Sequence, residues 1–299
     1  MRIRVMRIFS FSIIEMSLII GLVTFGRDGV ELVQEELVKA NKIAWETKAY
    51  EAWVRQYGTP AELAENLRQT GHHNLRYWLK YIGDPAGKRV LNLLGSHGRK
   101  AIALAMLGAE ATVVDLSAEN QRYALDVAAA ADVKLDYICS DALNIPDEEA
   151  LGQFDIVLME FGILHYFTDL HAIFEVVRRR LRPNGRLLLT DFHPFARAWA
   201  QTYNLPEPSG NYFDRQVKEG DVAFANLLPE EEREGLGKVL ACSWTLGDIL
   251  SAAGDSELYI RAFEEIPSPS NPNIPEFYTL VAEKIERALT PLYPNSNRQ

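Results

Sequence analysis

RVLNLLGSHGRKAIALAMLGAEATVVD, residues 89–115, is the stretch that decides the fold. An apolar run over 89–94 meets the turn GSHG at 95–98, and apolar residues then recur at helical spacing until Gly108. A second apolar, β-branched run ends in the carboxylate of Asp115. The pattern predicts strand, turn, helix and strand. A helix N-terminus beside a strand end suits a polar, partly anionic ligand, and the acid can accept ribose hydroxyls, so we expect a nucleoside-bearing cofactor.

The same alternation of strand and helix continues along the chain and predicts an α/β fold. Helical patterns begin at Ser117, near Leu170 and at Thr245. Further strands are predicted over 135–139, 154–159, 186–190, 258–263 and 277–282. Right-handed crossovers place helices on both faces of such a sheet. We therefore expect a doubly wound, mostly parallel, seven-stranded sheet, with the strand-end acids gathered at one edge.

The segments around this core have different patterns. Residues 30–87 predict an N-terminal helical cap, as one helix from Val30 to Gly58 and a second from Thr59 that breaks near Thr70-Gly71. Aromatic residues on the first helix are expected to pack it onto the main domain, or less often to cover a cofactor. Periodicity fails over about 192–240, after the fifth strand, and its aromatic residues favour a lid insertion. Residues 291–299 are expected to be a disordered tail.

Composition excludes several classes of protein. The chain has 31 Lys and Arg against 41 Asp and Glu, a net charge of −10, which argues against a nucleic-acid partner. Cys139 and Cys242 form no CxxC pair, and the adjacent His72-His73 lack further ligands, so we predict no metal site and a cytoplasmic location. Residues 1–29 are apolar after an Arg-rich start, but Glu15 interrupts them. We expect an extension outside the fold rather than a membrane anchor.

Four motifs carry a resemblance to a known family. VLNLLGSHG at 90–98 resembles V-L-D-x-G-x-G-x-G; Asn92 stands for the Asp, Leu94 and Ser96 replace the first two glycines, and Gly98 keeps the third. Three later motifs follow in order: Ser140-Asp141-Ala142 resembles an adenine-binding D-A step, FDIV at 154–157 resembles F-D-x-V, and LRPNGRLL at 181–188 resembles L-K-P-G-G-x-L-L. From about Lys88 to Lys284 the chain is similar to class I S-adenosylmethionine-dependent methyltransferases of the small-molecule kind, and 88–290 would be that Rossmann-like domain.

The resemblance implies S-adenosylmethionine as the cofactor and assigns a role to each strand end. Amides around Gly95, Ser96 and Gly98 would face its methionyl part. Asp115 would accept the ribose hydroxyls, and Leu116 and Asp141 would hold the adenine. The full expected cofactor set is Asn92, Gly95, Ser96, Gly98, Asp115, Leu116, Asp141, Ala142, Glu160 and Phe161.

The methyl acceptor is expected to be a small molecule, and neither its identity nor the oligomeric state follows from the sequence. His165 and Tyr212 are the candidate catalytic residues, with Tyr166 and His193 as neighbours of the same kind. A nicotinamide-dependent oxidoreductase is a rival, although only Gly95 and Gly98 are present where it would want three glycines. A nucleic-acid methyltransferase would want prolines after strand four, where EFGI stands at 160–163. A non-catalytic S-adenosylmethionine-binding protein stays open because the glycine pattern is incomplete.

Overall fold

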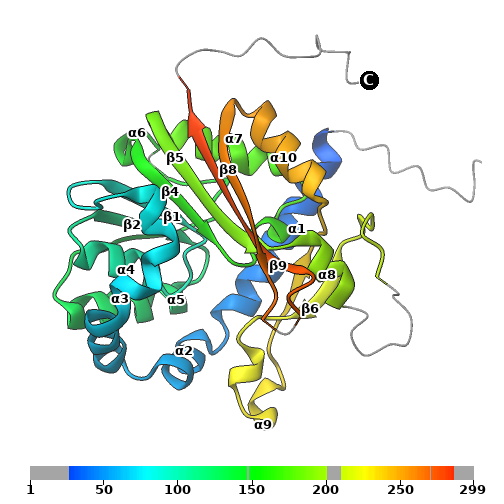
Figure 1. Ribbon diagram of the computed structural model, residues 1–299. Coiled ribbons are helices and arrows are strands. Elements are labelled where there is room, and N and C mark those ends of the chain that lie inside the picture. Colours follow the sequence, from blue (N-terminus) through cyan, green and yellow to red (C-terminus); the bar gives the residue numbers. More distant parts are fainter. Residues whose placement is uncertain (1–26, 147, 201–209, 270, 286–299) are drawn as a thin grey trace, which may run out of the picture.

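The computed structural model describes residues 27–146, 148–200, 210–269 and 271–285 (Figure 1). Most of the predicted apolar extension, the predicted tail and residues 201–209 of the predicted insertion lie outside the described residues. No helix in these ranges is both long and apolar enough to span a bilayer.

The predicted sheet is confirmed. Its seven strands have the order β3-β2-β1-β4-β5-β9-β8. They are β1 (Arg89–Leu93), β2 (Glu110–Asp115), β3 (Asp136–Cys139), β4 (Phe154–Glu160), β5 (Leu181–Phe192), β8 (Leu258–Pro267) and β9 (Pro275–Lys284). The first five are parallel, and β9 enters antiparallel between β5 and β8. Because the strand order reverses between β1 and β4, the carboxyl ends of these two strands border the crevice where such sheets bind ligands.

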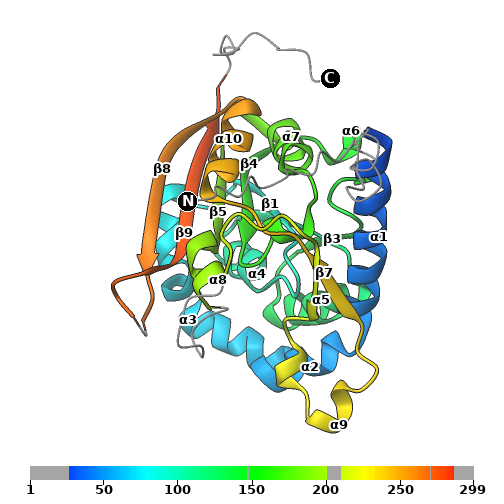
Figure 2. The same ribbon diagram turned by 90° about the vertical axis from the view of Figure 1, so that its right-hand side faces the viewer.

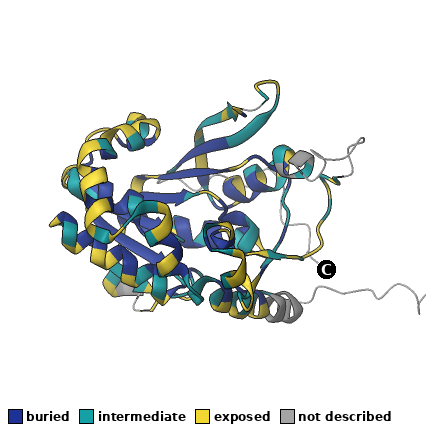
Figure 3. Cartoon of the chain, turned by 90° about the horizontal axis from the view of Figure 1, so that it is seen from below, coloured by how far each residue is buried: buried dark blue, intermediate teal, exposed yellow. Residues whose placement is uncertain are grey.

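Helices cover both faces of the sheet, as the alternation predicted. The helices are α3 (Pro60–Ile82), α4 (Arg99–Met106) and α5 (Ala118–Ala131) on one face, and α7 (Leu170–Arg180) and α10 (Leu246–Asp255) on the other. Neighbouring strand residues serve opposite faces: Ile156 packs in the first core and Val157 in the second. Figure 3 shows the strands buried between the exposed outer sides of the helices. A short α6 (Glu148–Leu151) precedes β4.

The N-terminal cap differs from the prediction in two places. The expected single helix is α1 (Arg27–Glu46) and α2 (Ala49–Tyr57), because the chain turns at Lys48, which has a left-handed φ of 61°. The expected break near Thr70-Gly71 is wrong, since α3 runs through it. Gly71 is buried there, and a Cβ on it would lie 3.6 Å from Ala103 of α4. This glycine serves close helix packing instead of ending the helix.

Residues 192–240 contain regular elements that periodicity did not reveal. They are α8 (Pro194–Ala200), β6 (Lys218–Asp221), the 3-10 turn η3 (Ala225–Leu227), α9 (Glu230–Arg233) and β7 (Lys238–Ala241). The strands β6 and β7 form a small antiparallel sheet beside α1 (Figure 2). The Asn41 side chain of α1 bonds both backbone groups of Leu240, donating at 3.1 Å and accepting at 2.8 Å. The cap and the insertion are therefore tied to each other directly.

Candidate functional site

A cavity of about 270 Å³ opens at the carboxyl ends of β1, β2 and β4. Most of the expected cofactor residues line it together: Gly95, Ser96, Asp115, Leu116, Asp141, Ala142, Glu160 and Phe161. These residues come from four different strand ends, which only the parallel sheet brings to one place. The cap forms the opposite wall with Trp45, Trp53 and Tyr57.

Asn92 and Gly98, the other two expected residues, do not line this cavity. Asn92 is fully buried in β1, where its amide donates to the Leu158 carbonyl at 3.2 Å. A Cβ on Gly95 would lie only 2.7 Å from Asn92 Oδ1, so the loop rests closely on this side chain. Gly98 precedes α4 with a φ of 67°, and its amide donates to the Gly95 carbonyl at 2.9 Å. Asn92 and Gly98 therefore support the conformation of the loop without lining the cavity.

At two positions of the loop after β1, residues other than glycine adopt a backbone conformation that is typical of glycine. Leu94 and Ser96 have left-handed φ values of 50° and 49°. An L-residue in this region costs roughly 1–2 kcal/mol relative to a right-handed conformation. These are the two positions at which the motif comparison expected glycine. The backbone conformation is thus retained although the sequence signature is not, and surrounding contacts must hold it.

Asp115 supplies the main contact that holds the loop. Its Oδ2 accepts from the Ser96 amide at 3.0 Å, and its Oδ1 accepts from the Ser117 amide at 3.0 Å and the Asn120 side chain at 3.1 Å. Burial raises the pKa of Asp115, while the hydrogen bonds from Asn120, Ser117 and Ser96 lower it. A carboxylate has about four acceptor positions, so Asp115 retains capacity for a ligand hydroxyl beside its protein donors.

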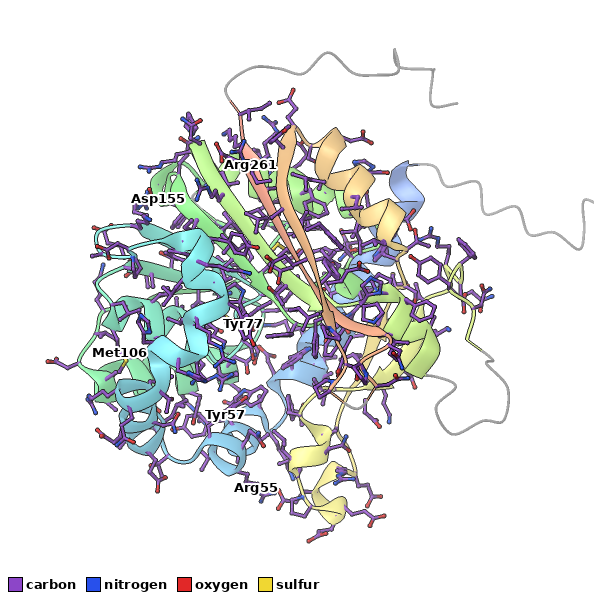
Figure 4. All side chains as sticks on the ribbon, viewed as in Figure 1. Arg55, Tyr57, Tyr77, Met106, Asp155 and Arg261 are labelled. Carbon is purple, nitrogen blue, oxygen red and sulfur yellow. The ribbon has the colours of Figure 1, made fainter. Side chains whose placement is uncertain are left out.

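Aromatic rings join the cap to the same loop. His97 packs against both Trp53 and Tyr57, with ring centroids 4.4 and 4.9 Å away. Tyr57, labelled in Figure 4, is the last residue of α2. Trp53 also donates to Asn120 Oδ1 at 2.7 Å, and Asn120 in turn donates to Asp115. The cap therefore contacts the loop and the predicted ribose acceptor through two separate routes.

Opposite charges meet at another part of the cavity wall. Lys100 is 8% exposed, and burial lowers its pKa to about 8 although Glu160 raises it. Its Nζ lies 4.4 Å from the Trp78 ring centre. Burial likewise raises the pKa of Glu160, which Lys100 and Arg99 lower. Two desolvated groups of opposite sign in one cavity suit a zwitterionic ligand, because each gains a counter-charge on binding.

The two candidate catalytic residues both line a small cavity of about 40 Å³, and only His165 also reaches a larger one. His165 lies in the 3-10 turn η2 (Leu164–Tyr166) and lines a larger, second cavity next to the first. Tyr212 lines neither of these two larger cavities, and its hydroxyl accepts from the Leu246 amide at 2.8 Å at the start of α10. Within the described ranges, no group of three or more His, Cys, Asp and Glu is arranged to hold a metal ion.

Several wall residues were missed or given a lesser role by the sequence reasoning. The cap residues Trp45 and Trp53 were expected mainly to pack, and they both pack and line the cavity. His97 and Lys100 were not considered. A signal for Lys100 exists, since a lysine within the apolar run KAIALAM is unusual on a buried helix face. Nothing in the sequence shows that His97 meets α2.

We predict that Ser96→Gly raises the free energy of unfolding by about 1 kcal/mol, because glycine adopts the left-handed conformation without the Cβ penalty. Gly98→Ala is the matched opposite change and should lower it, since its Cβ would also lie 3.2 Å from Ala124. Urea denaturation of the two variants measures both effects. Equal destabilisation by both substitutions would show that the loop is not strained at Ser96.

We also predict a pH dependence that arises from His97. Burial, with Arg99 and Lys100, lowers the pKa of His97 to about 3, against about 6.5 in an unfolded chain. The stabilising contribution is present above pH 6.5 and is lost as the pH falls toward 3, because only the unfolded chain binds the proton. His97→Phe keeps a ring packed against Trp53 and Tyr57 and removes the titrating group. Its free energy of unfolding should fall less steeply between pH 6.5 and 4 than that of the wild type; parallel curves would contradict the assignment.

Comparison with known proteins agrees with this geometry. Residues 90–185 match the model of a methyltransferase domain family. A ubiquinone biosynthesis O-methyltransferase of Xanthomonas axonopodis pv. citri is 32% identical over 157 residues, which are 52% of this chain and 63% of that relative. The chain thus spans less than two thirds of that relative's length.

Solved structures share the fold at low sequence identity. An S-adenosylmethionine-dependent methyltransferase described from Listeria monocytogenes aligns with a TM-score of 0.54 and 19% identity, over 73% of this chain and all of that one. The magnesium protoporphyrin IX methyltransferase of Synechocystis PCC 6803 with bound SAH aligns with a TM-score of 0.55 and 16% identity, over 83% and 99% of the two chains. The chain therefore contains a methyltransferase domain and has the fold of the class I S-adenosylmethionine-dependent methyltransferases.

Proposed function

We propose that this chain binds S-adenosylmethionine in the first cavity and transfers its methyl group to a small-molecule acceptor. One observation carries the proposal: a single cavity presents a strand-end acid for a ribose, an apolar and acidic edge for an adenine, and buried charges of both signs for an amino acid. The cofactor contains these three parts in one molecule. The methyltransferase-domain model matches residues 90–185, which contain the strand ends that build this wall.

Each part of the wall has a role in the proposal. Asp115 accepts from a ribose hydroxyl, Leu116 packs on the adenine, and Asp141 with the Ala142 amide bonds the adenine edge. The Glu160 carboxylate, with the backbone at Phe161, faces the ammonium group of the methionyl part. The Lys100 side chain faces its carboxylate. Asn92, Gly95, Ser96 and Gly98 shape the loop that passes the methionyl part.

The chemistry asks the protein mainly for alignment. When bound, S-adenosylmethionine supplies an electrophilic methyl group on a sulfonium. The chain's own task is to hold an acceptor in line with that group and to exclude water. In this proposal His165, which lines the adjoining cavity, takes the proton from a hydroxyl acceptor. Tyr212 acts at a distance in this scheme, by fixing the start of α10.

The surroundings of the cavity support three further parts of the proposal. Residues 192–240 serve as a lid over the acceptor, because β6 and β7 line the second cavity. The net charge of −10 favours a small molecule over nucleic acid. Cys139 and Cys242 are free thiols, which favours a reducing, cytoplasmic compartment.

Isothermal titration calorimetry with S-adenosylhomocysteine and NAD tests the cofactor. We expect saturable binding of the first and none of the second, since β9 lies antiparallel between β5 and β8, unlike the strand order typical of dinucleotide-binding folds. Binding of NAD alone would contradict the proposal. Tight binding of S-adenosylmethionine without turnover of any acceptor would instead indicate a non-catalytic binding protein.

Asp115→Ala should weaken S-adenosylhomocysteine binding at least tenfold, because charge-assisted hydrogen bonds are worth about 1.5–3 kcal/mol each and about 1.4 kcal/mol is tenfold. It should also lower the melting temperature, since three protein donors lose their acceptor. Asp136→Ala, an exposed acid that pairs with Lys134, is the matched control and should change neither quantity strongly. Calorimetry and thermal unfolding of both variants measure these effects. Wild-type affinity of Asp115→Ala for S-adenosylhomocysteine would contradict the role of Asp115.

Lys100→Met tests the charge at the methionyl end. Lys100 is cationic below its pKa of about 8, so the wild-type affinity should fall as the pH rises through 8. The amino group of the ligand titrates in a similar pH range. The Lys100→Met variant measures the pH dependence that comes from this group alone. In calorimetric titrations we expect Lys100→Met to bind S-adenosylhomocysteine several-fold more weakly than the wild type at pH 7. Its affinity should also change less with pH. Identical pH profiles for the two proteins would remove Lys100 from the binding site.

A further inference from the structure

A second cavity, of about 400 Å³, adjoins the proposed cofactor cavity. The two share the walls made by Trp45, Phe161, Gly162, Tyr166 and Ala223. The remaining walls of the second cavity come from His165, the end of β5, and the strands β6 and β7 of the insertion. An occupant of the second cavity would therefore lie directly beside an occupant of the first.

Exposed aromatic rings form one rim of the second cavity. Phe161 is 43% exposed and Phe192 is 41% exposed, which leaves large apolar surfaces in water. Both rings pack against Phe277, with centroids 5.5 and 5.3 Å away. Their positions are therefore fixed by neighbours while one side of each ring is open. Such preset, open ring surfaces are suited to a flat apolar ligand.

The backbone at this rim is strained and firmly held. Phe161 has a left-handed φ of 51°, an uncommon conformation for an aromatic residue. Its amide donates to the Thr190 carbonyl at 2.7 Å, and the next amide, of Gly162, donates to Asp191 at 2.6 Å. Asp191 is buried and also accepts from Ile163 and Leu164, both at 3.2 Å. Strain maintained by such a network is typical of a functional position.

The charges of the second cavity are paired within the insertion itself. Lys218 pairs with Asp214 at 2.7 Å, and Asp221 pairs with Lys238. The remaining charged wall residue is the exposed acid Glu219. Lys218 is the only cation among the described wall residues, against the two acids Glu219 and Asp221, so this wall carries a net negative charge that repels an anionic ligand.

We propose that this second cavity is the acceptor site and that it takes a flat, uncharged aromatic molecule whose ring packs on Phe161 and Phe192. That the bound molecule is a methyl acceptor rests on the proposed function. That the cavity binds a flat aromatic ring is inferred from its walls alone. A hydroxyl on such a ring would face His165, which lies against Gly162: a Cβ on that glycine would meet the imidazole at 3.1 Å.

Calorimetric titration with 2-naphthol, in the presence and absence of saturating S-adenosylhomocysteine, tests the proposal. We expect saturable binding with a dissociation constant on the order of 1 mM or lower, as typical ligand efficiencies give for a probe of this size. The anionic 2-naphthoate and the non-aromatic cyclohexanol should bind at least several-fold more weakly. Tighter binding of naphthoate, or no saturable binding of naphthol, would overturn the proposal. If S-adenosylhomocysteine did not bind while 2-naphthol did, only the proposed function would be contradicted.

Phe192→Leu locates the binding. Phe192 lines the second cavity but not the first, so naphthol affinity should fall roughly three- to tenfold, as expected for the loss of aromatic stacking, while S-adenosylhomocysteine affinity is unchanged. Phe213→Leu is the matched control, because Phe213 is 72% exposed and lines neither cavity. Melting temperatures verify that both variants fold. Equal loss of naphthol affinity in the two variants, or no loss in Phe192→Leu, would place the probe elsewhere.

Discussion

The carboxylate of Asp115 is the contact on which the rest of the site depends. It ends β2, but its hydrogen bonds reach the loop after β1 through Ser96 and the start of α5 through Ser117 and Asn120. Asn120 extends this network to Trp53 of the cap. One buried acid thus joins a strand, a loop, a helix and the cap around a single cavity. A ligand that bonds Asp115 affects all four at once, which physically links cofactor binding to the position of the cap.

A second buried acid, Asp191 of β5, likewise holds a loop, the one that follows β4. Asp191 is the last but one residue of β5 and accepts from three consecutive amides after β4, beginning at Gly162. In both places a carboxylate from a neighbouring strand holds a loop that contains a left-handed non-glycine residue, Ser96 in one and Phe161 in the other. The loops can therefore present side chains where glycine would present only backbone. In this chain Ser96 lines the proposed cofactor cavity, and Phe161 lines both that cavity and the second one.

Local patterns predicted the sheet and much of its active edge, because apolar periodicity and strand-end acids are short-range signals. Asp115 and Asp141 could be found in this way. The turn at Lys48, the continuous helix through Gly71 and the small sheet of the insertion could not, since each depends on tertiary packing. The same holds for His97, whose role exists only because α2 folds back onto the loop. The incomplete glycine motif misrepresented the loop, since its backbone keeps left-handed conformations at Leu94 and Ser96 and Asp115 holds the Ser96 amide.

A crystal structure of the protein with S-adenosylhomocysteine tests the central claim most directly. The account predicts the ribose at Asp115, the adenine between Leu116 and Asp141, and the methionyl part between Lys100 and Glu160. The sulfur should face the second cavity across Phe161. Density for the ligand outside the cavity between β1, β2 and β4, or a ribose that makes no contact with Asp115, would contradict the account.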